Sequence, residues 1–80
     1  METKKVEIYS TESCHFCHMA KDFFAEHNIQ FTDHDVATDP NAIKEAVEKS
    51  GQMGVPVIDI DGNIVVGFNE PELKRLLEIS

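Results

Sequence analysis

The sequence contains few cysteines, few basic residues and no long apolar run. Its 80 residues include 2 Cys, 3 Pro and no Trp, and 7 Lys and Arg stand against 15 Asp and Glu, for a formal net charge of -8. A chain so poor in basic residues repels phosphate backbones and anionic membrane surfaces. We therefore expect no nucleic-acid partner, and we interpret the acidic balance mainly as a feature that favours solubility.

No segment of the sequence reaches the length of about eighteen apolar residues that crosses a bilayer, and the N-terminal segment has no signal-peptide core. We expect a cytoplasmic protein with no membrane partner. The length suits one domain over residues 1–80, and we expect it to be a monomer. The two cysteines are too close in sequence to join distant parts of a fold, so they need a chemical explanation.

The spacing of apolar residues predicts alternating strands and helices. Strand patterns cover residues 6–9, 29–36, 55–60 and 64–66, and helical patterns cover residues 14–27, 40–50 and 70–77. The first two strands should be parallel because a helix joins them, and the last two should form an antiparallel hairpin. Helices are needed on both faces of this four-stranded mixed sheet. The prediction is an α/β fold, a three-layer sandwich in the order β-α-β-α-β-β-α, which is the minimal thioredoxin fold.

Turn and capping residues agree with these boundaries. The Asp-Pro pair at 39–40 supplies an N-cap and a first-turn proline for the second helix, and Gly51 is suited to ending that helix. The Asp-Gly pair at 61–62 indicates a tight turn between the last two strands. Asn69, with Glu72 three residues later, is typical of a capping box at the start of the last helix.

The two cysteines lie where the first strand gives way to the first helix. Two residues between Cys14 and Cys17 place their sulfurs about one helical turn apart, close enough for a disulfide. The start of a helix offers free N–H groups and a positive dipole end, which stabilise a thiolate. We expect catalysis of thiol–disulfide exchange, in which Cys14 attacks a substrate disulfide and Cys17 resolves the mixed disulfide.

Three neighbours of the cysteines are candidates for substrate contact or for tuning the thiolate. His15 and His18 could favour a negative sulfur when protonated, although a solvent-facing position is the more frequent one for a helical histidine. Phe16 lies between the cysteines, which favours exposure at a substrate-facing rim over burial in the core.

A metal site is the alternative for this segment, because cysteine and histidine are both metal ligands. Structural zinc sites draw a second ligand pair from elsewhere in the chain, and His27 and His34 do not have the usual spacing. We therefore expect no metal ligand and no tightly bound cofactor. The reactive group is then the redox-active disulfide of Cys14 and Cys17.

A Gly-Val-Pro segment precedes the third strand. Proline is tolerated at the start or edge of a strand, because it has no N–H to donate to the ladder. In a cis Val55–Pro56 bond the Val55 backbone would face outward and pair with an extended substrate segment. The sequence leaves the isomer open.

With these residues the chain resembles the glutaredoxin family over nearly its whole length. The matching features are the Val-Glu-Ile-Tyr segment at 6–9, the two cysteines followed by His-Met-Ala-Lys at 18–21, the Val-Pro pair at 55–56, and Gly67 before the last helix. The resemblance implies that Cys14 is the nucleophile, Cys17 the resolving thiol, Pro56 a cis proline and Val55 the backbone partner of the substrate.

The chain departs from the family at positions that bear on glutathione. Many glutaredoxins hold a glutathione carboxylate with a lysine where this chain has Thr11, and they carry Pro-Tyr where it has His15 and Phe16. Where they commonly have Gly-Gly, this chain has Val-Gly followed by Phe68. We therefore include Thr11, His15, Phe16, Val55, Pro56, Gly67 and Phe68 as substrate-binding candidates, with both halves of a glutathione site weakened.

The arrangement of Gly67 and Phe68 is more similar to the glutaredoxin-like NrdH redoxins, which take electrons from thioredoxin reductase and can supply ribonucleotide reductase. The resemblance implies protein disulfides as substrates, ribonucleotide reductase among them, and either thioredoxin reductase or glutathione as the reductant. Two other functions would use the same residues. One is an iron–sulfur or metal carrier, dimeric around a cluster bound through Cys14, and the other is a redox-sensing adaptor.

Overall fold

The computed structural model describes residues 5–52 and 54–79, and in these residues the chain forms four strands and three helices. In chain order they are β1 (Val6–Ser10), α1 (His15–Glu26), β2 (Thr32–Asp35), α2 (Pro40–Ser50), β3 (Val57–Ile60), β4 (Asn63–Val66) and α3 (Glu70–Leu77). The element order expected from the sequence is confirmed.

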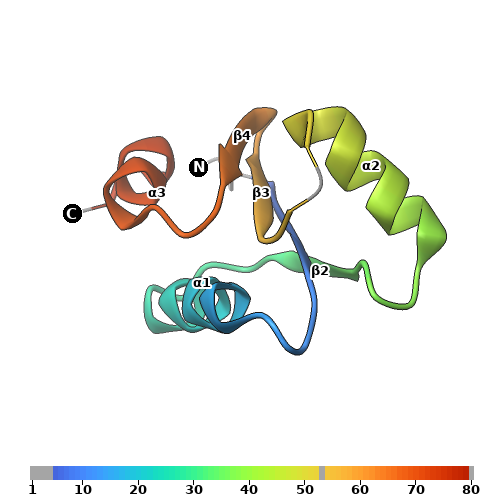
Figure 1. Cartoon of the computed structure of the whole chain (residues 1–80). Coiled ribbons are helices and arrows are strands. Elements are labelled where there is room, and N and C mark those ends of the chain that lie inside the picture. Colours follow the sequence, from blue (N-terminus) through green and yellow to red (C-terminus); the bar gives the residue numbers. More distant parts are fainter. Residues whose placement is uncertain (1–4, 53, 80) are drawn as a thin grey trace.

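The four strands form one mixed sheet in the order β2-β1-β3-β4. β1 pairs with β2 in parallel, and β3 is antiparallel to both β1 and β4. Helices α1 and α3 lie on one side of this sheet and α2 on the other, so the molecule has three layers (Figure 1). The predicted thioredoxin fold is therefore confirmed, with β1 in the interior of the sheet.

Strand β1 has both faces buried because its side chains alternate between the two layers. Val6 and Ile8 belong to a core under α1 and α3, which contains Val6, Ile8, Ala20, Phe23, Phe24, Ile58, Ile60, Val65 and Leu73. Tyr9 points to the other face, where it packs with Ala42, Ala46 and Val57. The two alanines of α2 are small, which lets this helix lie close to the sheet.

Two strands are shorter than the sequence predicts. The expected strand at 29–36 pairs only over Thr32–Asp35, since its partner β1 begins at Val6 and the register sets Glu7 opposite Thr32. The expected strand at 55–60 begins at Val57, directly after a cis peptide bond between Val55 and Pro56. Proline has no N–H to contribute to a ladder, which accounts for the later start.

The expected turn and cap positions are confirmed, with one exception. Asp39 caps α2, and Gly51 follows it with a φ of 76°. The turn at 61–62 has positive φ at both residues, as a tight hairpin turn requires. Asn69 accepts a hydrogen bond from the Glu72 backbone N–H at 3.4 Å. The Glu72 carboxylate pairs instead with Arg75, one helical turn further on, so the reciprocal half of the capping box is absent.

A polar network joins α2 to the sheet. The ammonium group of Lys49 donates to Asp59 Oδ2 at 2.7 Å and to the Tyr9 hydroxyl at 2.8 Å, and it lies 3.6 Å from Glu7 Oε2. Asp59 is a buried residue in the middle of β3. Although burial acts to raise it, the pKa of the Asp59 carboxyl is lowered by the hydrogen bond from Lys49. The network fixes the end of α2 that leads into the loop before Pro56.

We predict that Lys49→Met destabilises the protein by about 2 kcal/mol, because it leaves the carboxylate of Asp59 without its cation. The expected destabilisation is smaller than that for breaking a fully buried ion pair, since the Lys49 side chain is 28% exposed. Urea unfolding followed by circular dichroism measures the change. Lys44→Met, at an exposed position of the same helix, is the control and should have little effect. Equal unfolding midpoints for the two variants would contradict the prediction.

The stability difference between the wild-type protein and Lys49→Met should also depend on pH. The pKa of Asp59 is lower in the folded protein than its ordinary value of 3.8, so its contribution is fully present above that value. It is lost as the pH falls through the folded-state pKa. The difference in unfolding free energy should therefore be constant near neutral pH and shrink in acid, which urea titrations at a series of pH values would show.

Candidate active site

Cys14 is the N-cap residue of α1. Its backbone is extended, with φ of -91° and ψ of 112°, and its N–H donates to the carbonyl of Thr11 at 3.3 Å. Its sulfur accepts a hydrogen bond from the Cys17 backbone N–H at 3.1 Å. The oxygen of a serine, threonine or aspartate usually fills this position. The first turn of α1 contains no acidic residue, so no carboxylate competes for the positive end of the helix dipole.

Cys17 lies one turn further along α1 and is fully buried. Burial, together with a hydrogen bond to Cys14, raises the pKa of the Cys17 thiol to about 12. Cys14 is partly exposed and both thiols are free. An accessible sulfur at the helix start and a buried sulfur in contact with it are the parts that a two-step exchange requires. The order of attack, Cys14 first and Cys17 second, stays a prediction.

The loop before β3 lies next to Thr11 and brings the Val55 backbone to the same end of the sheet. The Val55–Pro56 peptide bond is cis, which the sequence left open. The Pro56 carbonyl accepts a hydrogen bond from Gly67 N–H at 2.8 Å, so the end of β4 holds this loop. Gly67 has a φ of 81°, a conformation that favours glycine.

The residues around Cys14 differ in exposure. Phe16 is 56% exposed, which confirms the expectation that it faces solvent, and the ring of His15 packs against its edge. His18 is also exposed, but its Nε2 lies 2.5 Å from the carbonyl of Glu12 and so ties α1 to the preceding loop. Phe68 is different, because it is half-buried and packs against Phe23 of the core.

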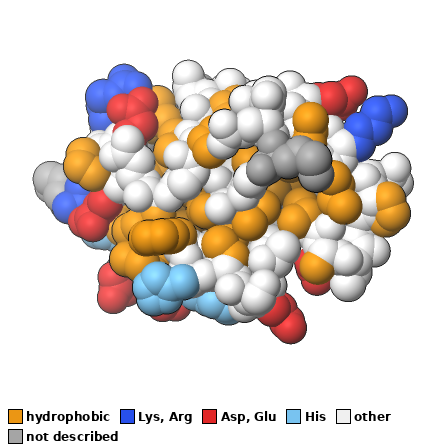
Figure 2. All heavy atoms as spheres, in the orientation of Figure 1, with side chains coloured by type: hydrophobic (Ala, Val, Ile, Leu, Met, Phe, Trp, Pro, Cys, Tyr) orange, Lys and Arg blue, Asp and Glu red, His pale blue; other side chains and the backbone are white. Residues whose placement is uncertain are grey.

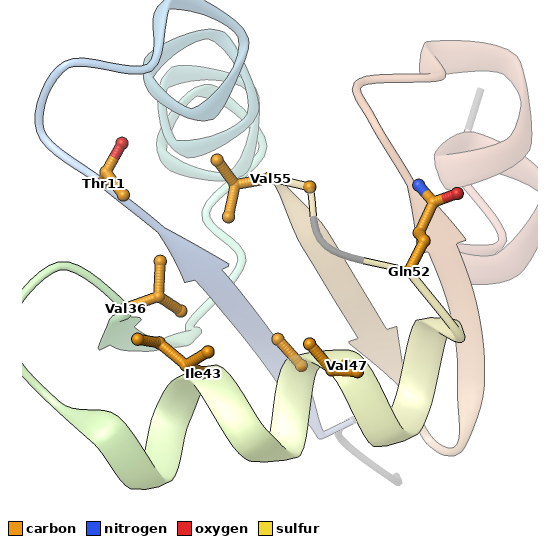
Figure 3. A pocket seen from close by; sticks show the side chains of 8 residues that line it. Thr11, Val36, Ile43, Val47, Gln52 and Val55 are labelled. Atoms are coloured by element: carbon orange, nitrogen blue, oxygen red, sulfur yellow. The ribbon is translucent and has the colours of Figure 1, made fainter.

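An open groove runs from the site toward α2. It has a volume of about 230 Å³ and is lined by Thr11, Val36, Ile43, Ala46, Val47, Gln52, Gly54 and Val55. Figure 3 shows Thr11 and Val55 on one side of the groove and Ile43 and Val47 of α2 on the other. None of the described residues in this lining is charged. Thr11, where the resemblance sets a lysine that holds a glutathione carboxylate in many glutaredoxins, thus borders an apolar surface.

Hydrophobic side chains are also prominent on the outer surface. Figure 2 shows one face of the molecule, where they run across the middle while the charged side chains lie toward the margins. Among the residues that the structure describes, the large hydrophobic ones with substantial exposure are Phe16, Met19, Ile43 and Val66. Of these, Phe16 lies between the two cysteines in sequence.

A cluster beneath α1 was not found by sequence reasoning. Asp33 of β2 accepts a hydrogen bond from Ser10 Oγ at 2.7 Å, and its other oxygen lies 2.6 Å from the ammonium group of Lys21. Ser10, which lies just beyond the strand predicted over residues 6–9, is the last residue of β1 and is buried. These residues are far apart in the chain, and no local motif links them. Only the parallel pairing of β1 and β2 brings them together.

The histidines outside the cysteine segment have other partners. His34 bonds to Glu7 at 3.0 Å and stacks on Tyr9, and His27 packs against Phe23 at the end of α1. Within residues 5–52 and 54–79, no three His, Cys, Asp or Glu side chains are grouped so that they could hold a metal ion. In the same residues, no helix has both the length and the apolar character needed to span a bilayer.

The glutaredoxin family model matches residues 6–65. A glutaredoxin-like 8.6 kDa protein encoded in the rubredoxin operon of Clostridium pasteurianum is 47% identical over 91% of this chain and 97% of its own length. The glutaredoxin-like protein NrdH of Lactococcus lactis subsp. cremoris is 32% identical over 89% of this chain and 97% of its own.

A solved structure shows the same fold. The crystal structure of a mutant of the thioredoxin-like protein BC3987 superposes with a TM-score of 0.90. It is 30% identical in sequence, and the match covers 95% of this chain and 97% of the other. The likeness in fold therefore extends over nearly the whole chain.

We predict that brief alkylation of the reduced protein modifies Cys14 and spares Cys17. The raised pKa and complete burial of Cys17 leave little of its reactive thiolate near neutral pH. Iodoacetamide at pH 8 should give a single adduct at Cys14 by mass spectrometry, whereas the unfolded chain should take two. In Cys14→Ser, Cys17 should react about a hundredfold more slowly than a free cysteine. Alkylation of Cys17 at the rate of a free thiol would contradict the prediction.

Proposed function

Since this chain belongs to the glutaredoxin family, we propose that it is a dithiol electron carrier that reduces disulfides of partner proteins through Cys14 and Cys17. The observation that carries the proposal is the hydrogen bond from the Cys17 N–H to the sulfur of Cys14 at the start of α1. It joins an accessible nucleophile to a buried second thiol within one helical turn. Because such a dithiol must be kept reduced, we place its activity in the cytoplasm. We also propose that it acts as a monomer.

In the first step the Cys14 thiolate attacks one sulfur of the substrate disulfide. A bond forms between Cys14 Sγ and that sulfur, the substrate S–S bond breaks, and the other substrate sulfur leaves with the electron pair and takes up a proton. The N–H of Cys17 and the helix dipole stabilise negative charge on Cys14 before the attack. The backbone N–H and carbonyl of Val55, next to the cis proline, are suited to hold an extended substrate segment beside it.

In the second step Cys17 loses its proton and attacks Cys14 Sγ. The bond between Cys14 and the substrate breaks, the substrate leaves as a second thiol, and the Cys14–Cys17 disulfide forms. Two electrons have then passed from the dithiol to the substrate. The negative charge on Cys14 that opposed ionisation of Cys17 is absent in the mixed disulfide, so the resolving thiol becomes easier to ionise once the first step is complete.

We further propose that thioredoxin reductase, rather than glutathione, returns the electrons, as the resemblance to NrdH redoxins implies. Thr11 stands where many glutaredoxins hold a glutathione carboxylate with a lysine, and the groove beside it is apolar and without charge. The net charge of -8 also disfavours an anionic tripeptide. The apolar groove and the exposed Phe16 suit a protein surface instead, and ribonucleotide reductase is a candidate substrate.

We predict that Cys14→Ser abolishes disulfide reduction and that Cys17→Ser accumulates mixed disulfides. The first variant lacks the nucleophile, and the second completes only the first step. The measurement is insulin reduction, followed by turbidity, together with non-reducing electrophoresis of the trapped species. Ser13→Ala, which changes the loop but neither sulfur, is the control. Full dithiol reductase activity in both cysteine variants would exclude the proposed mechanism.

A second prediction concerns the reductant. The oxidised protein should consume NADPH at least about tenfold faster with thioredoxin reductase than with glutathione and glutathione reductase, because the site lacks a cation for the glutathione carboxylate. Thr11→Lys should raise turnover with the glutathione couple several-fold, and Thr11→Ser is its matched control. NADPH oxidation followed by absorbance checks both. Faster turnover of the wild-type protein with glutathione would overturn this part of the proposal.

A further inference from the structure

The two cysteines alone do not account for the ionisation of Cys17 that the resolving step requires. Cys17 has no exposed surface, and burial is the main reason that its pKa rises to about 12. It must nevertheless become a thiolate for the second step to proceed near neutral pH. The negative charge on Cys14 is absent in the mixed disulfide, which removes one of the causes that raise the pKa of Cys17. The free-energy cost of forming a thiolate in a buried position remains. A fixed positive charge nearby would offset this cost.

Lys21 is placed to supply that charge. It follows Cys17 by four residues on α1, a spacing that brings two side chains to the same face of a helix. Its side chain is 23% exposed and does not extend into solvent, since its ammonium group lies 2.6 Å from Asp33 Oδ2. Lys21 acts on the Cys17 thiol in the direction that lowers its pKa.

The position of Lys21 is fixed from the sheet. Asp33 lies on β2 and accepts a second hydrogen bond, from Ser10 Oγ at 2.7 Å. Although burial opposes it, the hydrogen bonds from Lys21 and Ser10 lower the pKa of Asp33, so this carboxylate stays charged and keeps its hold on the ammonium group. Ser10 ends the strand that leads directly into the Cys14 loop. The contacts among Ser10, Asp33 and Lys21 therefore connect the end of β1 to α1, on either side of the Cys14 loop.

We propose that Lys21, held by Asp33, is a positioning residue of the resolving step, whose ammonium group favours ionisation of Cys17 in the mixed disulfide. The inference rests on the proposed function and extends it to a residue outside the cysteine motif. The groups that bear on Cys17 are the sulfur of Cys14, the Thr11 backbone and Lys21. Those that bear on Lys21 from the sheet are Asp33 and, through it, His34 of the same strand.

A disulfide with a coloured leaving group separates the two chemical steps. Dithiobis(nitrobenzoate) releases one coloured thiolate when Cys14 attacks it and a second when Cys17 resolves the mixed disulfide, so stopped-flow absorbance gives both rates. Lys21→Gln keeps a donor for Asp33 but removes the charge. Its second phase should be about tenfold slower at neutral pH, the change expected for one unit in the pKa of Cys17, and the pH profile of that phase should shift upward.

The controls separate electrostatics from a structural defect. Lys21→Arg keeps the charge and the pairing with Asp33 and should restore the second phase to within about twofold. Lys44→Gln makes the same charge change at an exposed position of α2 and should leave both phases unchanged. In a Cys17→Ser background, which shows only the first phase, Lys21→Gln should have little effect. Urea unfolding of each variant confirms that it is folded under the assay conditions.

Several outcomes would overturn the proposal. A second phase with the wild-type rate and pH profile in Lys21→Gln would show that the ammonium group does not act on Cys17. Equal slowing of the first phase in the Cys17→Ser background would show a general defect at the site instead. If the wild-type protein lacked a second phase altogether, the dithiol mechanism would fail, and that result is distinct from the other two.

Discussion

The proposed chemistry of this chain depends on the hydrogen bond from the Cys17 N–H to the sulfur of Cys14. In most helices the side-chain oxygen of a small polar residue occupies this position. Here the reactive atom itself caps the helix, so the folding of α1 also places the nucleophile at the positive end of the dipole. The same helix carries the second sulfur into the core, where burial raises the pKa of the Cys17 thiol.

The two faces of the sheet support this arrangement in different ways. On the side of α1 and α3, a large apolar core with four phenylalanine rings in contact fixes the helix that begins at the two cysteines. On the side of α2, two alanines allow a close approach and a network around Lys49 fixes the end of the helix. That end leads into the loop with the cis Val55–Pro56 bond. The Cys14 segment and the Val55–Pro56 segment are thus held from opposite layers.

The surroundings of the cysteines are largely apolar. Phe16, between the two cysteines in sequence, has an exposed ring. Thr11 lines a groove whose described residues are mostly valine, isoleucine and alanine and carry no charge. Such a surface buries apolar area against a protein more readily than it binds a small anion. The ion pair of Lys21 and Asp33 joins α1 to β2.

Local patterns in the sequence were sufficient for the element order, the helix caps at Asp39 and Asn69, the hairpin turn, and the place of the cysteines at a helix start. Each of these depends on residues close together in the chain, such as apolar spacing or a capping side chain. Strand lengths, the cis isomer, the burial of Cys17, and the clusters around Lys49 and Asp33 depended on the tertiary structure. They arise from contacts between segments distant in sequence, because pairing register and burial are set by the partner strand or helix and not by the segment itself.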